Sequence, residues 1–150
     1  MTAGLELLAE LVAIPSHASQ PEGIRRIGEL VGAELRALGF QEVPPEPPSH
    51  RVPSWAEELL SPEASFDALL DPIVLRRPGT VPGRLLLLGD LDMALVTTSP
   101  RLVMDGKRAL GPAVADMKGG LVVMVDALRQ LGSRAAPEIV IVLSRDEQAG

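Results

Sequence analysis

Apolar residues recur every three or four positions along three segments of the chain, a spacing typical of helices that bury one face. In the second segment, apolar residues from Ile24 to Leu38 fall on one side. Proline or glycine follows each segment, and both commonly mark the end of a helix. Helices are therefore predicted over residues 3–14, about 21–38 and 118–131.

Two further segments, residues 84–89 and 137–143, are apolar runs without helical spacing. Such runs are typical of strands that are covered on both faces. Shorter strands are predicted at 41–43 and 73–75, and a hairpin at 102–110 that turns at Asp105-Gly106. Because helices and buried strands alternate, the predicted class is α/β with a mainly parallel sheet.

Five prolines between Pro44 and Pro53 interrupt this pattern. Proline disfavours both helix interiors and central strands. A surface insertion is therefore predicted over residues about 44–64, with a short helix from Ser54 to Leu60. His50 lies in this insertion and is expected to be solvated.

Composition narrows the class of protein. A chain of 150 residues with 46% apolar content can bury one core. No apolar run is long enough to cross a bilayer, and the first residues lack a signal-peptide pattern. The net charge of −6 disfavours nucleic acid and anionic membranes as partners. Cysteine is absent, which excludes disulfides and is compatible with the cytoplasm.

Acidic residues follow the two long apolar strands and a glycine-containing turn. Asp90 and Asp92 end the first strand, residues 146–148 (Asp-Glu-Gln) end the second, and Asp116 precedes the third predicted helix. In α/β sheets, ligands bind beyond the carboxyl ends of the strands. If these strands are neighbours, the carboxylates converge at one edge of the sheet, and their mutual repulsion favours a positive group between them.

Three motifs, in this order and spacing, resemble the zinc-dependent exopeptidase and deacylase family that includes carboxypeptidase G, acetylornithine deacetylase and succinyl-diaminopimelate desuccinylase. They are Gly89-Asp90-Leu91-Asp92, then Asp116-Met117-Lys118-Gly119-Gly120, and Asp146-Glu147-Gln148-Ala149-Gly150. Residues 21–40 and 103–107 look most like the carboxypeptidase G branch. The resemblance implies that residues 1–150 are the amino-terminal portion of a three-layer α/β/α catalytic-type domain. The rest of that domain and a lid domain lie outside this chain.

The resemblance also implies roles for individual residues around two zinc ions. Asp116 matches the carboxylate that bridges both metals, and Glu147 matches the general base. Asp92 matches the carboxylate that orients a ligand histidine. Asp90 stands where the family has that histidine, and Gln148 stands where it has a glutamate ligand.

The two departures leave three functions open. Aspartate is shorter than histidine and charged, and the amide oxygen of glutamine is a weak zinc ligand. In the first, the protein is a metallohydrolase that cleaves an amide next to a free amino-acid carboxylate. The chain would then be a fragment or one part of a split enzyme. The second is a pseudoenzyme that keeps the fold for binding or assembly. The third is an enzyme repurposed for a biosynthetic route that uses the acidic pocket without zinc.

The end of the chain predicts a macromolecular partner. The strand at 137–143 is expected to be central, and a chain that stops at Gly150 exposes an apolar sheet edge, which favours aggregation. A second polypeptide or the missing carboxy-terminal remainder is therefore expected to cover it. Neither His17 nor His50 is expected to bind metal.

Overall fold

The computed structural model describes residues 2–44, 72–94 and 100–145. The predicted surface insertion and its short helix lie outside these residues. The described elements are α1 (Ala3–Ala13), α2 (Pro21–Ala37), β1 (Gln41–Val43), β2 (Ile73–Arg77), β3 (Arg84–Asp90), β4 (Val103–Asp105), β5 (Arg108–Leu110), the π-helical turn η2 (Val114–Lys118), α4 (Gly119–Leu131) and β6 (Glu138–Ser144). The predicted helices, strands and hairpin are thus confirmed to within a few residues.

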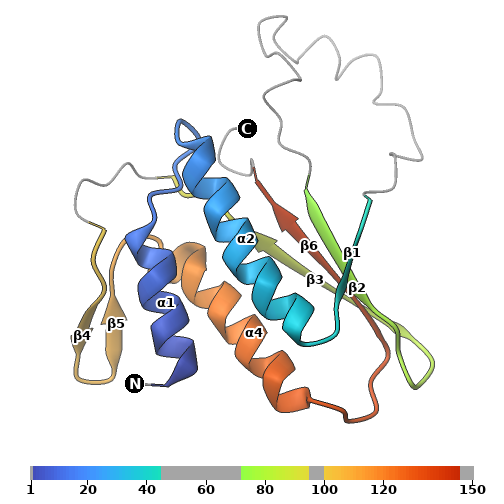
Figure 1. The fold of residues 1–150 in the computed structure, drawn as a ribbon. Helices are drawn as coiled ribbons and strands as arrows, with labels where there is room; N and C mark the ends of the chain where they lie inside the picture. Colours follow the sequence, from blue (N-terminus) through green and yellow to red (C-terminus); the bar gives the residue numbers. More distant parts are fainter. Residues whose placement is uncertain (1, 45–71, 95–99, 146–150) are drawn as a thin grey trace, which may run out of the picture.

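Four strands form a sheet in the order β1-β2-β6-β3 (Figure 1). The α/β class is confirmed, but the described sheet is mixed and not mainly parallel. β3 and β6 pair in parallel, whereas β1 with β2 and β2 with β6 pair antiparallel. Residues 78–83, which connect β2 to β3, are too few for the crossover that parallel strands need. β2 therefore runs opposite to β3, and because β6 is parallel to β3, β2 also runs opposite to β6.

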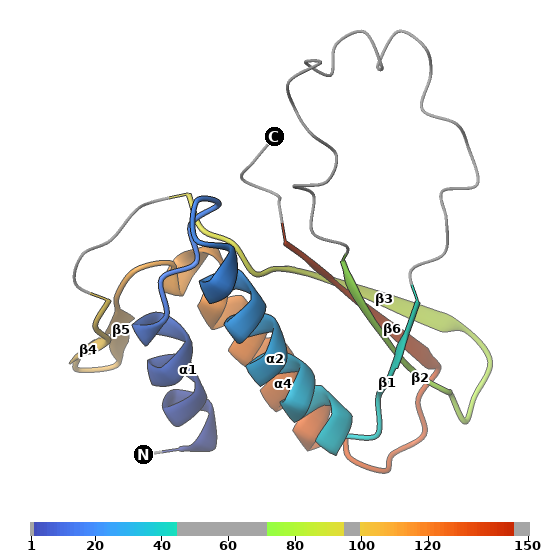
Figure 2. The same ribbon diagram turned by 45° about the horizontal axis from the view of Figure 1, so that its top comes forward.

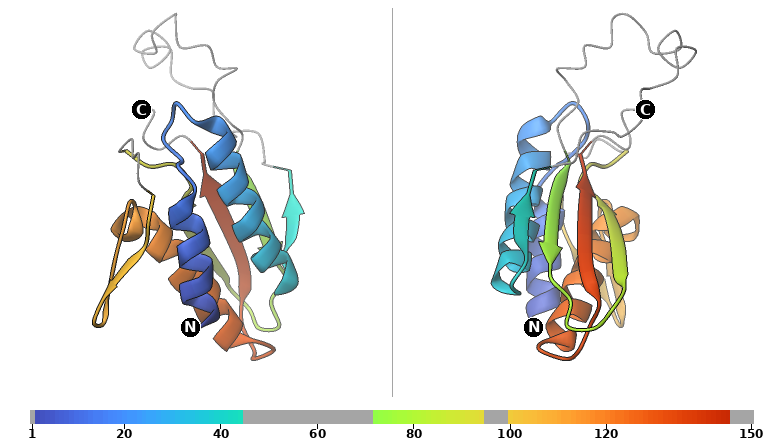
Figure 3. Two further views of the ribbon diagram at one scale, coloured as in Figure 1. Left: turned by 60° about the vertical axis from the view of Figure 1, so that its left-hand side comes forward. Right: turned by 90° about the vertical axis from the view of Figure 1, so that its right-hand side faces the viewer.

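Helices α2 and α4 pack on one face of this sheet, and α1 packs against α4 on the same side. The strands lie in front of the helices when the sheet is viewed from its other side (Figure 3, right). Alternate residues of β2 and β6 point into the helical layer and are buried, namely Ile73, Leu75, Ile139, Ile141 and Leu143. This alternation shows that one sheet face carries the core.

The opposite face of the sheet is not covered by any described helix. Leu86 and Leu88 of β3 are 56% and 66% exposed, and Val140 and Val142 of β6 are partly exposed. The prediction that β3 is covered on both faces is therefore wrong for the described residues. The reason is that α1, α2 and α4 all pack on the same side.

The β4–β5 hairpin lies beside α1, away from the four-stranded sheet (Figures 1 and 2). Gly106 at its turn has a φ of +57°, which confirms the predicted Asp105-Gly106 turn. The hairpin leads directly into η2, so it positions the turn that carries Asp116. None of the described helices is both long enough and apolar enough to span a bilayer.

Candidate active site

The carboxyl ends of β3 and β6 place the first acidic segment. Asp90 is in register with Ser144, and the Leu91 amide donates to the Ser144 carbonyl at 3.0 Å. The chain then turns inward, so Asp92 is only 3% exposed. The expected meeting of the two strand ends at one edge of the sheet is confirmed.

The connection between α1 and α2 packs against this segment. The Met93 amide donates to the Ser16 carbonyl at 3.0 Å, and His17 forms a parallel bridge with Met93. Ser16 is fully buried, and its Oγ has no hydrogen-bond partner among the described residues. His17 lies nearby, but its Nδ1 is 2.8 Å from Ser19 Oγ, so this ring nitrogen already has a local partner.

Asp116 lies in η2, a turn with unusual backbone geometry. Ala113 precedes the turn with φ 56° and ψ 16°, in the left-handed region, and the Asp116–Met117 peptide is cis. The Lys118 amide closes the turn by donating to the Ala113 carbonyl at 2.8 Å. Gly119 is required after it, because a Cβ there would lie 2.4 Å from the Val114 carbonyl oxygen.

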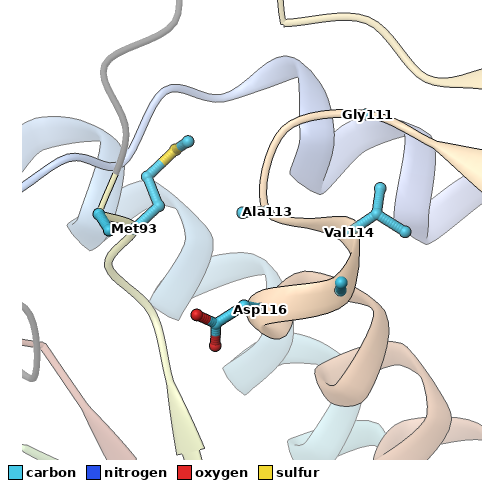
Figure 4. A pocket seen from close by; sticks show the side chains of 7 residues that line it. Met93, Gly111, Ala113, Val114 and Asp116 are labelled. Carbon is cyan, nitrogen blue, oxygen red and sulfur yellow. The ribbon is translucent and has the colours of Figure 1, made fainter.

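A cavity of about 190 Å³ opens between the Asp116 turn and Met93. Its lining is almost entirely apolar: Met93, Ala94, Gly111, Ala113, Val114, Ala115 and Asp116. Figure 4 shows the Asp116 carboxylate projecting from η2 toward the side on which Met93 lies. The cavity therefore offers one carboxylate in an apolar setting, which suits a small ligand with a positive or hydrogen-donating group.

Lys118 lies behind this turn as a buried cation. Its side chain is 2% exposed, and burial lowers its pKa to about 8. Its Nζ donates to the Ile14 carbonyl at 2.6 Å and lies 4.0 Å from Met93 Sδ. The sequence predicts neither this contact of Lys118 nor the burial of Ser16. No sequence signal links Lys118 to a carbonyl 104 positions away.

The predicted site residues can be placed only in part. Asp90, Asp92 and Asp116 lie in segments that adjoin the same end of the sheet, whereas Glu147 and Gln148 lie outside the described residues. Within residues 2–44, 72–94 and 100–145, no three His, Asp or Glu side chains are grouped so that they could hold a metal ion.

The donor set of the described segments fits zinc poorly. Asp90, Asp92 and Asp116 offer carboxylate oxygens but no imidazole, and the Nδ1 of His17 has its partner in Ser19. Zinc sites in proteins are usually completed by nitrogen or sulfur ligands. No reaction step through zinc follows from these residues.

The fold is a partial α/β domain that solved peptidase structures share. Three of these structures serve as examples. Human carnosine dipeptidase 1 matches with a TM-score of 0.73 and 17% identity, over 98% of this chain and 32% of that one. Aminopeptidase PepT from Bacillus cereus matches at 0.71 and 16%, over 98% and 37%. The M20 family metallo-carboxypeptidase Sso-CP2 from Sulfolobus solfataricus matches at 0.65 and 16%, over 99% and 32%.

One curated protein provides the sequence relationship. Carboxypeptidase G2 from Pseudomonas sp. (strain RS-16) is 28% identical over 153 residues, which cover 97% of this chain and 32% of that protein. No established family profile matches the chain. The resemblance to the zinc-dependent exopeptidase and deacylase family is confirmed by these similarities, and the chain spans about a third of the length of the relatives it matches.

Proposed function

We propose that this chain is the amino-terminal portion of the catalytic-type domain of a peptidase-like or deacylase-like hydrolase whose metal site is weakened or lost. The reaction would cleave an amide next to a free amino-acid carboxylate in a small substrate. One observation carries the proposal: Asp116, in its Asp-Met-Lys-Gly-Gly motif, faces a cavity beside the segment that carries Asp92. Likeness to carboxypeptidase G2 along 97% of the chain supports the class.

The proposed roles follow the motif positions. Asp116, Asp90 and Gln148 occupy positions that bind zinc in the family, and of these Asp116 alone keeps the family's residue. Glu147 is the proposed general base, and Asp92 is the proposed positioning carboxylate. Burial of Asp92 to 3% exposure supports a fixed orientation for its side chain. We place the protein in the cytoplasm as part of the same proposal.

The second candidate is a pseudoenzyme or a repurposed biosynthetic protein that works without zinc. The apolar cavity around Asp116 and the absence of an imidazole from the described acidic segments favour it. Both departures fall on ligand positions, whereas Gly119, which the Asp116 turn requires, remains. A fold kept for binding needs that glycine but not the ligands.

Native mass spectrometry of the full-length protein, with and without added zinc, separates the candidates. About two zinc ions per site support the hydrolase. A particle that stays metal-free supports the pseudoenzyme or the repurposed protein. The double variant Asp90→His, Gln148→Glu sharpens the result: gain of zinc-dependent amide hydrolysis indicates simple loss from an active ancestor, and no gain indicates a remodelled pocket.

We also propose that the remainder of the polypeptide, or a second polypeptide, covers the open face of the sheet. The support is the exposure of Leu86 and Leu88, since a strand that carries two large exposed leucines is unfavourable in water. Sedimentation and thermal unfolding of a polypeptide limited to residues 1–150 test this. A monomer that stays in solution and unfolds cooperatively would contradict it.

A further inference from the structure

Lys118 is a buried cation to which the proposed function gives no role. It and Asp92 are the two buried charged side chains among the described residues, with 2% and 3% exposure. The hydrogen bond from its Nζ goes to a backbone carbonyl, that of Ile14, at 2.6 Å. Burial of an ammonium group costs free energy unless hydrogen bonds or opposite charges compensate for the lost water. The burial of Lys118 therefore needs a structural reason.

The position of Lys118 connects three segments of the site. Lys118 ends the η2 turn that carries Asp116, and its Nζ reaches the α1–α2 connection at Ile14 and approaches Met93 Sδ at 4.0 Å. The hydrogen bond from the Met93 amide to the Ser16 carbonyl joins the other two segments to each other. One side chain and one backbone bond thus hold together segments that are far apart in the sequence.

The α1–α2 connection is itself tightly held. A Cβ at Gly23 would lie 1.7 Å from the Pro15 carbonyl oxygen, so the first turn of α2 rests directly on this connection. Because α2 packs against this connection, the Ile14 carbonyl has a fixed position. The hydrogen bond from Lys118 to that carbonyl links the Asp116 turn to this fixed point.

We propose that Lys118 is a positioning residue that fixes the Asp116 turn against the α1–α2 connection and the Asp92 segment. The effect of Lys118 on ligand binding rests on the proposed function, because this effect assumes that Asp92 and Asp116 act on one ligand. The local geometric effect does not depend on that assumption. The two can therefore be measured separately.

The first experiment compares backbone amide hydrogen exchange in the full-length protein and its Lys118→Met variant. Methionine keeps an unbranched apolar stem but removes the donor to the Ile14 carbonyl. We expect the Met93 amide to exchange about tenfold faster in the variant, because its own bond to Ser16 spans the loosened junction. The Thr80 amide, which donates to the Ala136 carbonyl at 2.8 Å in the β2–β3 connection, should change much less.

The matched control is Lys107→Met. Lys107 is the other lysine of the chain, is exposed and lies in the β4–β5 turn. This variant should leave both amides unchanged. Equal acceleration of the Met93 and Thr80 amides in Lys118→Met would mean that Lys118 contributes only to global stability, and no acceleration would mean that it holds nothing; either result overturns the proposal.

The second experiment titrates zinc into the same full-length proteins by calorimetry. If the parent binds zinc, Lys118→Met should bind it about tenfold more weakly, and Lys107→Met should bind it as tightly as the parent. If the parent binds zinc and Lys118→Met binds it as tightly, the consequence for ligand binding is wrong. If the parent binds no zinc, the pseudoenzyme or repurposed protein is favoured over the hydrolase, while the exchange experiment still decides whether Lys118 positions the turn.

Discussion

At the scale of single residues, Ala113 shows how the Asp116 turn tolerates an unusual backbone. Its φ of 56° lies in the left-handed region, where a side chain costs about 1 kcal/mol relative to glycine. Alanine therefore keeps the turn at a small energetic cost.

We expect Ala113→Gly to leave the free energy of unfolding unchanged or to raise it by a few tenths of a kcal/mol. Relief of the left-handed strain offsets the greater entropy of glycine in the unfolded chain. Ala127→Gly, at an exposed position of α4, is the matched control and should lower stability by about 1 kcal/mol. Urea unfolding measures both, and an equal loss in both variants would show that Ala113 is not strained.

At the scale of secondary-structure elements, the junction of η2 and α4 depends on two adjacent glycines with different roles. A Cβ at Gly119 would meet the Val114 carbonyl oxygen at 2.4 Å, whereas the atom nearest to one at Gly120 would be the flexible end of the Met117 side chain, at 3.3 Å. Backbone cannot move aside as a side chain can. The first glycine is therefore required by the turn and the second is not.

Substitution of these glycines tests the distinction. Gly119→Ala should lower the free energy of unfolding by about 1–3 kcal/mol, as expected for a forced backbone shift. Gly120→Ala should be neutral or stabilising by up to about 1 kcal/mol, because alanine favours the helix. Thermal and urea unfolding of the two variants provide the comparison; similar losses would argue against the contact with Val114.

Glu138 joins three strands through charge. It accepts hydrogen bonds from Arg84 of β3 and Arg76 of β2, and the hydrogen bond from Arg84, followed by that from Arg76, holds its pKa below the usual value. A carboxyl whose pKa is lower in the folded state stabilises the fold above its unfolded pKa, and this contribution is lost as pH falls through the folded value. The side chains of Arg76 and Arg84 are 52% and 66% exposed, respectively, so solvent weakens this ionic contribution to stability.

Glu138→Gln should therefore lower stability more at pH 7 than at pH 3, with the difference shrinking as salt is added. The urea midpoints of parent and variant, measured across this range, provide the check. Glu42→Gln is the control, because Glu42 pairs with one arginine, Arg36, outside the central strands. A pH-independent difference at Glu138 would indicate a packing effect and not an ionic one.

Local sequence patterns predicted most of these elements but not their arrangement. The spacing of apolar residues in α2 and the continuous run in β3 identify a helix and a strand because each depends on neighbouring residues. The direction of β2 relative to β6 and the side on which the helices pack depend on chain connections, which the pattern does not encode. For the same reason the motifs indicate Asp92 and Asp116 as candidate site residues, whereas the contact of Lys118 with Ile14 appears only in three dimensions.

At the scale of the whole molecule, the sheet presents two unlike faces. One face carries the core beneath α1, α2 and α4, and the other exposes Leu86 and Leu88. The chain spans about a third of the length of its relatives, so most of a relative's length has no counterpart here. The exposed apolar face and the partial coverage of the relatives both support the proposal that this face is buried in the complete protein.

The variant Leu88→Lys makes this argument testable, because its effect should reverse with context. In the complete protein or complex, a lysine in place of a buried leucine should lower stability by several kcal/mol or prevent assembly. In a polypeptide limited to residues 1–150, the same change should reduce aggregation, because Leu88 is 66% exposed there. Val81→Lys, at a position 42% exposed in the β2–β3 connection, should be nearly neutral in both contexts. If Leu88→Lys changes the stability of the complete protein as little as Val81→Lys does, the open face is exposed to solvent there. Neither the remainder of the polypeptide nor a second polypeptide then packs on it.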